Sequence, residues 1–403
     1  MKIDKRNKIG NVPNLRFQFN DAWEKYRVSD FMEFFPTNSL SWEQLEYNTE
    51  NLCNLHYGLI HRGAPTQINT DTFQLPNIRE EFIPKTYTLC QDGDVAFADA
   101  SEDTNDVAKV VEFFNCNDKK IVCGLHTIHG RDKLNITAKG FKGYAFSSFP
   151  FRKQIKLLAQ GTKVYSISQR NFSECFIGIP SKEEQAKIAN LLQFIDDRIS
   201  TQSQIIQRLE SLIKELSKKI FSQKVRFKDD NGNDFSDWEM KKLGDIATIT
   251  TGSSNREDSV LDGKYTFFDR SQDIRTSHRY LFDKEAIIVP GEGQEFIPQH
   301  YIGKFDLHQR AYAIFDFANI NGGFLYYYIL SNDKHLQSHA VGSTVKSLRL
   351  PMFQSMPIKT PCIQEQRKIA NLLSAINEKL AVEQKTLLEY QKQKKYLLSQ
   401  MFI

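Results

Sequence analysis

The chain has 403 residues, of which 53 are Lys or Arg and 49 are Asp or Glu, giving a formal net charge of +4. The length accommodates two or three domains, and 40% hydrophobic residues is typical of a globular protein rather than a disordered or fibrous one. The longest apolar run, at 324–330, has seven residues, far short of the roughly 18 that cross a bilayer.

The N-terminal run MKIDKRNKIGNVP is basic but has no apolar core, so no signal peptide is expected. The cysteines form no C-x-x-C pair, which argues against a zinc ribbon or a disulfide scaffold and favours a reducing, cytoplasmic location. The six are Cys53, Cys90, Cys116, Cys123, Cys175 and Cys362.

Each half of the chain opens with a related segment. Arg16-Phe17 precedes Trp23-Glu24, and Arg226-Phe227 precedes Trp238-Glu239. The second copy carries five extra residues around Asn231-Gly232, a dipeptide typical of turns. The two openings therefore indicate a duplication.

The body after the first opening has strand-like runs at 94–97 and 109–114 and a helical pattern at 148–158. Its charge is segregated: residues 92–118 hold eight acids and one base, and residues 119–170 hold eleven bases and one acid. Aromatic residues lie among these bases, a pattern that suits a polyanion-binding face because cations displace counterions condensed on phosphates. A solvated face that balances the acids is the alternative. The candidate DNA-binding residues here are Arg131, Lys133, Lys142, Arg152, Lys153, Lys156 and Lys163.

A long helix is predicted at 181–223. Pro180 blocks helix upstream, and Ser181 with Glu184 makes an S-x-x-E capping box. Apolar residues then recur at alternating steps of four and three, the seam of a coiled coil. At about 1.5 Å per residue this helix is roughly 60 Å long. Its seam residues are Ile188, Leu192, Ile195, Ile199, Ile206, Leu209, Ile213 and Leu216.

This segment recurs 181 positions later. Fifteen of the 35 positions at 161–195 are identical to those at 342–376, including E-Q-x-K-I-A-N-L-L at 184–192 and 365–373. Gln202 and Glu383 share one seam position, where a polar residue lowers stability and can fix register. Antiparallel pairing of the two helices is the simplest way to bury both seams; packing of each helix on its own body is the alternative. The second helix, 362–403, has the seam residues Ile369, Leu373, Ile376, Leu380, Leu387 and Leu397.

The second body has strand-like runs at 286–289 and 311–315 and a helical pattern at 322–332. Arginine forks can contact guanine in the major groove. If residues 306–310 form a strand, His308 and Arg310 share one face and Gln309 takes the other. An ordinary surface or core contact is the alternative for each single residue. The candidates are Arg256, Arg270, Arg275, Arg279, His308, Gln309, Arg310, Lys346 and Arg349.

Motifs for catalysis are missing. The spacing of His335 and His339 matches H-E-x-x-H, but Leu336 replaces the Glu, and neither a nucleotide-binding P-loop nor G-x-S-x-G occurs. His126 and His129 lie near Cys123 without further ligands at a metal-binding spacing, so no metal is expected. The two bodies do not align with each other, although their ends do. The sequence thus favours a binding or scaffolding protein of α+β class with a pseudo-two-fold internal repeat.

These features resemble the specificity subunits of type I restriction–modification enzymes. The resemblance rests on P-x3-E-Q-x-K-I-A-N-L-L at 180–192 and 361–373, G-[ST]-x-V-x-S at 161–166 and 342–347, and the Trp-Glu pairs at 23 and 238. It implies a first target-recognition domain at 1–180, a helix at 181–223, a second recognition domain at 224–361 and a helix at 362–403. The two helices would form an antiparallel coiled coil.

The resemblance further implies a non-catalytic subunit that reads a bipartite, asymmetric double-stranded DNA target. Two adenine-N6 methyltransferase subunits holding S-adenosylmethionine would dock on it, and two motor-nuclease subunits using ATP and Mg would join through them. This chain itself would bind no cofactor and no membrane. A coiled-coil scaffold, or another DNA-binding protein without such partners, is the alternative function, and an autonomous nuclease or methyltransferase is disfavoured by the missing motifs.

Overall fold

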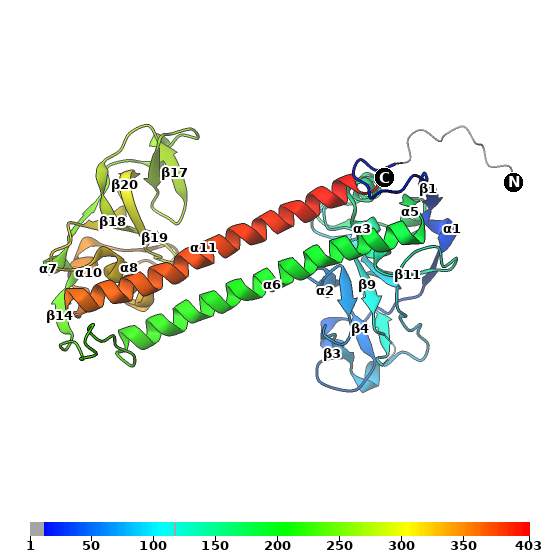
Figure 1. Ribbon diagram of the computed structural model, residues 1–403, viewed down its shortest axis with the longest axis horizontal. Coiled ribbons are helices and arrows are strands. Elements are labelled where there is room, and N and C mark those ends of the chain that lie inside the picture. The colour runs from blue at the N-terminus through cyan, green and yellow to red at the C-terminus, as the bar shows by residue number, and fades with distance from the viewer. Residues whose placement is uncertain (1–11, 117) are drawn as a thin grey trace. The chain divides into compact units, whose positions relative to one another are not determined.

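The computed structural model describes residues 12–116 and 118–403, so the basic run at residues 1–11 lies outside the described residues. The chain divides into two compact units, residues 1–203 with 386–403 and residues 204–385. Two long helices, α6 (Lys182–Phe221) and α11 (Ile363–Gln400), contribute residues to both units (Figure 1). Among the described residues, no helix combines the length and apolar character needed to cross a bilayer.

The first unit contains two larger sheets and several short helices. The five-stranded sheet has the order β2-β11-β7-β9-β5, and the four-stranded sheet has the order β10-β4-β6-β3. Pairs β5–β9 and β4–β10 are parallel, and the other pairs in these sheets are antiparallel. The elements before α6 are β1 (Glu24–Arg27), α1 (Val28–Phe31), β2 (Met32–Phe35), η1 (Trp42–Gln44), β3 (Leu45–Glu46), β4 (Cys53–Leu55), α2 (Tyr57–His61), β5 (Gln67–Asn69), β6 (Asn77–Ile78), η2 (Glu80–Phe82), β7 (Val95–Ala98), β8 (Ala100–Ser101), β9 (Val110–Phe114), β10 (Ile121–Cys123), β11 (Thr127–Asp132), α3 (Phe141–Ser147), α4 (Phe149–Leu158), β12 (Tyr165–Ser166), α5 (Gln169–Ser173) and β13 (Phe176–Ile179).

Strand β7 lies in the middle of this unit because both of its faces are apolar. Val95 and Phe97 point into a core shared with α3, α4 and the start of α6. Ala96 and Ala98, on the opposite face, belong to a core shared with α2 and the four-stranded sheet. The alternation follows from the two-residue period of a strand.

The second unit contains a different sheet. Its six strands have the order β15-β21-β18-β20-β16-β17, in which β16 and β20 are parallel. The long strands β18 and β20 and the helix α8 dominate its core. The elements between α6 and α11 are β14 (Glu239–Lys242), α7 (Leu243–Ile246), β15 (Thr248–Thr251), η3 (Arg256–Asp258), β16 (Tyr265–Phe268), β17 (Ile274–Ser277), β18 (Phe282–Pro290), β19 (Glu292–Gly293), β20 (Gln299–Leu307), β21 (Ala311–Phe315), α8 (Gly322–Ser331), α9 (Asp333–His339), β22 (Lys346–Ser347), α10 (Leu350–Gln354) and β23 (Pro357–Thr360).

The predicted antiparallel pairing of the long helices is confirmed in each unit. In the first unit, Leu192 near the start of α6 and Leu397 near the end of α11 share one core. In the second unit, Ile220 at the end of α6 and Leu373 near the start of α11 share another. All fourteen predicted seam residues are buried or half-buried, as the 3.5-residue period requires.

The predicted capping box at the start of α6 is only half formed. Ser181 Oγ accepts a hydrogen bond from the backbone N–H of Glu184 at 3.4 Å. The Glu184 carboxylate, however, is bound by Arg16. An ion pair to a distant segment has displaced the local contact that the sequence pattern suggested.

Candidate nucleic-acid interface

The first head, residues 12–180, is fixed to its long helix by two adjacent residues of α6. Glu184, only 1% exposed, accepts hydrogen bonds from Arg16 Nε and Nη2, both at 2.7 Å. The amide of Gln185 donates to the carbonyl of Pro180 at 2.8 Å and accepts from the backbone N–H of Ala138 at 2.6 Å. The repeated E-Q pair is therefore an anchor for the head.

The second head, residues 224–361, is fixed in the same way. Arg226 Nη2 donates to Glu365 at 2.8 Å, and Gln366 donates to the carbonyl of Pro361 at 2.8 Å. The amide oxygen of Gln366 accepts from Asn321 N at 2.8 Å. Matching contacts thus attach two heads whose sheets differ, with five and four strands in the first head and six in the second.

The matching contacts also include a tyrosine pair that the sequence comparison missed. Tyr144 on α3 donates to Asp196 on α6 at 2.9 Å, and Asn377 on α11 donates to Tyr327 on α8 at 3.0 Å. Asp196 and Asn377 differ by the 181-residue offset of the repeat, whereas Tyr144 and Tyr327 differ by 183. Because the two tyrosines are offset by two residues from the repeat and lie in bodies of dissimilar sequence, comparison of the two halves does not align them.

At one end of the six-stranded sheet, the structure gathers most candidates of the second head. Parallel strands β16 and β20 end at Phe268 and Leu307, which are register partners, so Asp269 and His308 emerge side by side. Gln309 N donates to the carbonyl of Ser254 at 2.9 Å, which brings the segment before η3 to the same place. We call the charged groups here the arginine cluster: Arg256, Arg270, Arg275, Arg279 and Arg310, with Asp258, Asp269, Asp273, Glu292 and Asp306.

The acids of the arginine cluster hold the guanidinium groups in place. Asp269 and Asp306 have no exposed side-chain surface, and Arg256 and Arg279 reach them at 3.5 and 3.6 Å. About half of each of these arginine side chains is nevertheless exposed, 52% for Arg256 and 53% for Arg279. Arg310, at 59% exposed, pairs with Glu292. Buried acids thus orient the guanidinium groups, while part of each arginine side chain faces water.

Five arginines and five acids give the cluster no net charge. Burial lowers the pKa of His308, which favours its neutral form. A balanced cluster gains little from long-range attraction to phosphates, but arginine forks held in fixed directions suit contacts with base edges. This chemistry fits sequence reading better than general DNA affinity.

Residues 306–310 do not form one strand, so the condition under which His308 and Arg310 would share a face is not met. Strand β20 ends at Leu307, and 308–310 form the turn to β21. His308 is 4% exposed and its Nδ1 accepts a hydrogen bond from the Arg310 backbone at 2.9 Å, so it shapes the turn. Gln309 and Arg310 are exposed. The chain reverses direction between β20 and β21, so His308 and Arg310 lie in a turn and do not alternate along a strand.

The last two candidates of the second head, Lys346 and Arg349, lie in or shortly after β22, the strand that pairs with β19. Lys346 is in β22, opposite Gly293 of β19, and is half-buried. Arg349 is exposed and immediately precedes α10. Strand β19 also carries Glu292 of the arginine cluster, so β22 borders that cluster.

In the first head, two predicted DNA-binding bases pair with buried acids; Lys142 is itself buried and Arg131 is partly exposed. Lys142 is 3% exposed, donates to Thr137 Oγ1 at 2.9 Å and lies 3.5 Å from the buried Glu112. Arg131 binds the buried Asp94 through two hydrogen bonds of 2.8 and 2.7 Å. The charge count of the segment could not distinguish these internal ion pairs from surface bases.

The other predicted DNA-binding bases of the first head are more accessible. Lys153, Lys156 and Lys163 are exposed, and so is Lys133, whose Nζ donates to the carbonyl of Ser29 at 3.0 Å. Arg152 is half-buried, and burial lowers its pKa to about 10. The exposed lysines therefore remain the better phosphate contacts.

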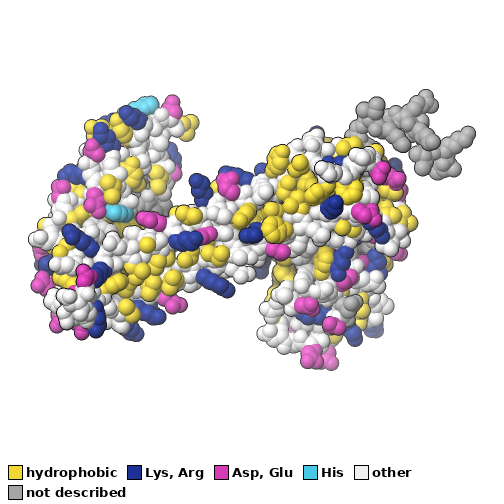
Figure 2. Space-filling view, in the orientation of Figure 1, with side chains coloured by type: hydrophobic (Ala, Val, Ile, Leu, Met, Phe, Trp, Pro, Cys, Tyr) yellow, Lys and Arg dark blue, Asp and Glu magenta, His cyan; other side chains and the backbone are white. Residues whose placement is uncertain are grey.

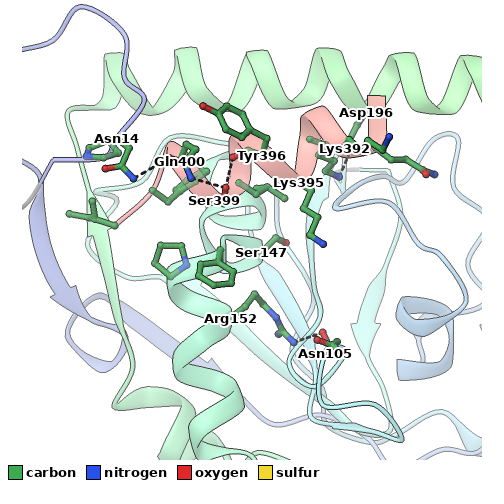
Figure 3. Close-up of a pocket in the computed structure, with 18 of the residues that line it drawn as sticks. Asn14, Asn105, Ser147, Arg152, Asp196, Lys392, Lys395, Tyr396, Ser399 and Gln400 are labelled. Carbon is green, nitrogen blue, oxygen red and sulfur yellow. Dashed lines mark hydrogen bonds and ion pairs between the residues drawn. The ribbon is translucent and has the colours of Figure 1, made fainter. Parts of the chain in front are cut away.

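Arg152 and Lys156 line an open groove of about 1360 Å³ in the first unit. Figure 3 shows Arg152 directed to Asn105 on one wall and Lys392 and Lys395 coming from α11 on the other. Lys109 and Lys394 complete its bases. The acid in the lining is Asp196, 2.5 Å from Lys394. The groove is therefore strongly basic and wide open.

Sequence reasoning missed Lys109, Lys392 and Lys395 as members of this groove. Lys392 and Lys395 are three residues apart on α11 and share a face of the helix, but nothing local places that face beside α4. On the face drawn in Figure 2, Lys and Arg side chains are interspersed with Asp and Glu.

A buried cluster in the first head contains Cys90, Cys123 and His129. His126 and His129 are three residues apart in the sequence, but His126 is half exposed and pairs with Asp99 at 3.1 Å. Cys90, 33 residues before Cys123, was not considered with them. Contacts between sheets, which no local spacing reveals, bring the three residues together.

The fold and the candidate interface define a recognition protein with two different heads on a duplicated helical frame. Comparison with known proteins specifies the class. Residues 235–390 match a family model described as the type I restriction modification DNA specificity domain. In this part the chain is similar to the specificity subunits of type I restriction–modification systems.

Relatives cover different parts of the chain. The EcoDI specificity subunit of Escherichia coli is 29% identical over 140 residues, 35% of this chain and 31% of that protein, so the chain spans about a third of it. The putative MjaX specificity subunit of Methanocaldococcus jannaschii is 22% identical over 98% of this chain and 94% of that protein.

Solved structures share the fold over almost the full length. The crystal structure of a type I system S subunit from M. genitalium has a TM-score of 0.65 at 18% identity and covers 97% of this chain and 99% of that one. A chain from a structural study of complex assembly of the type I system has a TM-score of 0.56 at 14% identity, with coverage of 95% and 98%. At these identities the likeness concerns the fold.

Proposed function

We propose that this subunit reads a bipartite, asymmetric double-stranded DNA target. The observation that carries the proposal is the combination of a repeated anchor with unlike heads. Glu184-Gln185 and Glu365-Gln366 fix the heads by matching contacts, whereas one head has sheets of five and four strands and the other a sheet of six. Two different heads attached by equivalent contacts would suit two different half-sites of a DNA target.

The two heads supply complementary chemistry for this task. The arginine cluster of the second head offers oriented forks for base edges, and the lysine-lined groove of the first unit offers bases for phosphates. Because α6 and α11 belong to both units, they are the elements that would set the gap between half-sites.

The proposal includes partners. Two adenine-N6 methyltransferase subunits, which would hold S-adenosylmethionine, would dock on this chain, and two motor-nuclease subunits using ATP and Mg would join through them. The complex would act in the cytoplasm, where the host DNA lies. A scaffold without DNA, or a DNA-binding protein without these partners, is the competing function; it predicts no change in methylation when a head is exchanged.

Exchange of residues 25–160 for the corresponding head of another specificity subunit tests the proposal. The chimera, expressed with its modification subunit, should methylate a sequence altered in one half only, as measured by methylation mapping of total DNA. Exchange of the second head is the matched control and should alter the other half. Methylation unchanged by both exchanges would refute reading by the heads.

A further inference from the structure

The first head contains a buried group of three side chains that the reading of DNA does not use. Cys90 and Cys123 are 4% and 2% exposed and His129 is fully buried. One ligand atom from each residue lies within 4.8 Å of the other two. The Sγ atoms of Cys90 and Cys123 are 3.6 Å apart.

That sulfur–sulfur distance fits two ligands of one tetrahedral ion. A disulfide requires about 2.05 Å. Two thiolates at about 2.3 Å from a zinc ion, with a tetrahedral angle between them, lie roughly 3.8 Å apart. The observed 3.6 Å is close to the second value and well away from the first.

The histidine supplies the independent observation. His129 Nε2 hydrogen-bonds the carboxylate of Asp94 at 2.8 Å, and Nδ1 is buried without a hydrogen-bond partner among the described residues. An orphaned buried ring nitrogen is costly unless something binds it. Metal-binding histidines typically donate their other N–H to a carboxylate, and Asp94 occupies that place.

The carboxylate itself is firmly held. Asp94, 1% exposed, accepts two hydrogen bonds from Arg131 and one from the backbone of Gln91 at 2.9 Å. Arg131 therefore helps to hold the carboxylate that orients His129. Such support fixes the ring of His129 with Nδ1 available.

We propose that Cys90, Cys123 and His129 bind a zinc ion that joins the two sheets of the first head. Cys123 ends β10 in the four-stranded sheet, and His129 lies in β11 of the five-stranded sheet. Cys90 precedes β7, and its backbone N–H donates to the carbonyl of Ile121 in β10 at 2.8 Å. Three protein ligands leave one tetrahedral position for a small non-protein ligand such as water.

Metal analysis of the full chain tests the proposal. The chain is produced without a polyhistidine tag in zinc-supplemented medium, gel-filtered and analysed by mass spectrometry for metals. We expect about one zinc per chain, and loss of most of it in Cys123→Ser. Cys175→Ser, which changes another buried thiol of the first unit outside the cluster, is the matched control and should keep the zinc.

A second measurement uses only the native chain, in case Cys123→Ser does not fold. Stepwise blocking of thiols with a mercurial reagent should release the zinc to a chromogenic chelator. Cobalt substituted for zinc should show thiolate-to-metal charge-transfer absorption. A native chain without zinc, zinc that is released before thiols react, or a Cys90–Cys123 disulfide in the intact mass would each overturn the proposal.

Discussion

Arg16 and Glu184 are 168 residues apart in the chain and form a two-pronged ion pair at the base of the first head. Arg226 and Glu365 repeat the pair at the base of the second head. Both carboxylates are buried, at 1% and 0% exposed. The repeated Glu184 and Glu365 thus attach each head to its long helix; this contact does not involve DNA.

Replacement of Glu184 by Ala should destabilise the first unit by roughly 3 kcal/mol, because a partly buried guanidinium loses its counter-charge. Urea unfolding followed by circular dichroism, together with hydrogen exchange resolved by segment, measures the loss. Glu183→Ala, which changes the exposed neighbour on α6, is the control and should change stability by less than about 0.5 kcal/mol. Equal effects of the two substitutions would contradict the anchoring role.

The exposed lysines of α4, Lys153 and the groove residue Lys156, should contribute to the salt dependence of DNA binding. Lys153→Gln and Lys156→Gln together should flatten the slope of log affinity against log salt by about 0.9 per lost phosphate contact. Fluorescence anisotropy with a labelled duplex provides the slope. Lys187→Gln, exposed on α6 and outside the groove lining, should leave it unchanged. An unaltered slope in the double variant would remove α4 from the interface.

Removal of the Arg310 fork should act on sequence preference. Arg310→Ala should weaken binding to the recognised sequence by about 1–3 kcal/mol and relax one position of the half-site read by the second head. Methylation mapping identifies the target first, and competition binding with single-base variants then measures the preference. Lys304→Ala, an exposed change elsewhere on β20, should preserve it. Uniform weakening on all sequences would instead assign Arg310 to phosphate contact.

The length of α6 should control the gap between half-sites. Four residues inserted after Gln202 lengthen the helix by about 6 Å, close to two base-pair steps of about 3.4 Å each. The mapped gap should change, or methylation should stop. The same four residues inserted at Asn231-Gly232, an exposed turn, form the control and should leave the gap as it was. A constant gap in the helix variant would exclude the spacer role.

His56 should make the first head sensitive to mild acid. Its Nδ1 accepts a hydrogen bond from Gly58 N at 3.1 Å, and burial lowers its pKa from 6.5 to about 4. Below about pH 6.5 the unfolded chain therefore protonates His56, whereas the folded chain does so only below about pH 4. The contribution of His56 to the unfolding free energy is fully present above pH 6.5 and is lost as the pH falls towards 4. The loss is on the order of 3 kcal/mol.

His56→Asn keeps an acceptor for Gly58 N and removes this titration, so its unfolding free energy should fall less between pH 7 and pH 4 than that of the native chain. Urea unfolding at a series of pH values measures the difference. His278→Asn, an exposed substitution in the second head, should follow the native chain. Parallel curves for the native chain and His56→Asn would exclude His56 as the source.

The features predicted best from the sequence are those carried by local repetition. The long helices and their seam follow from a 3.5-residue period, and α6 spans Lys182–Phe221 where 181–223 was expected. The duplicated openings followed from matched residues. Strand β21, Ala311–Phe315, also coincides with its predicted run because both faces are apolar.

The candidate sites were predicted less well because they depend on contacts distant in sequence. Lys142 counted as a surface base, but on α3 it pairs with the buried Glu112 of β9. The groove needs α11 beside α4, and the cysteine–histidine cluster needs two sheets to meet. Residue type and spacing identify which groups are present, whereas tertiary packing decides which of them face solvent.

The charge balance of the arginine cluster bears on how such a reader would find its target. A surface that attracts all phosphates equally has the same residence time on non-target and target DNA, which slows location of the target. Five cations neutralised by five neighbouring anions have little hold on an arbitrary duplex. Residence time then depends on whether the bases complement the forks, so mismatched sites are released quickly and matched ones are kept.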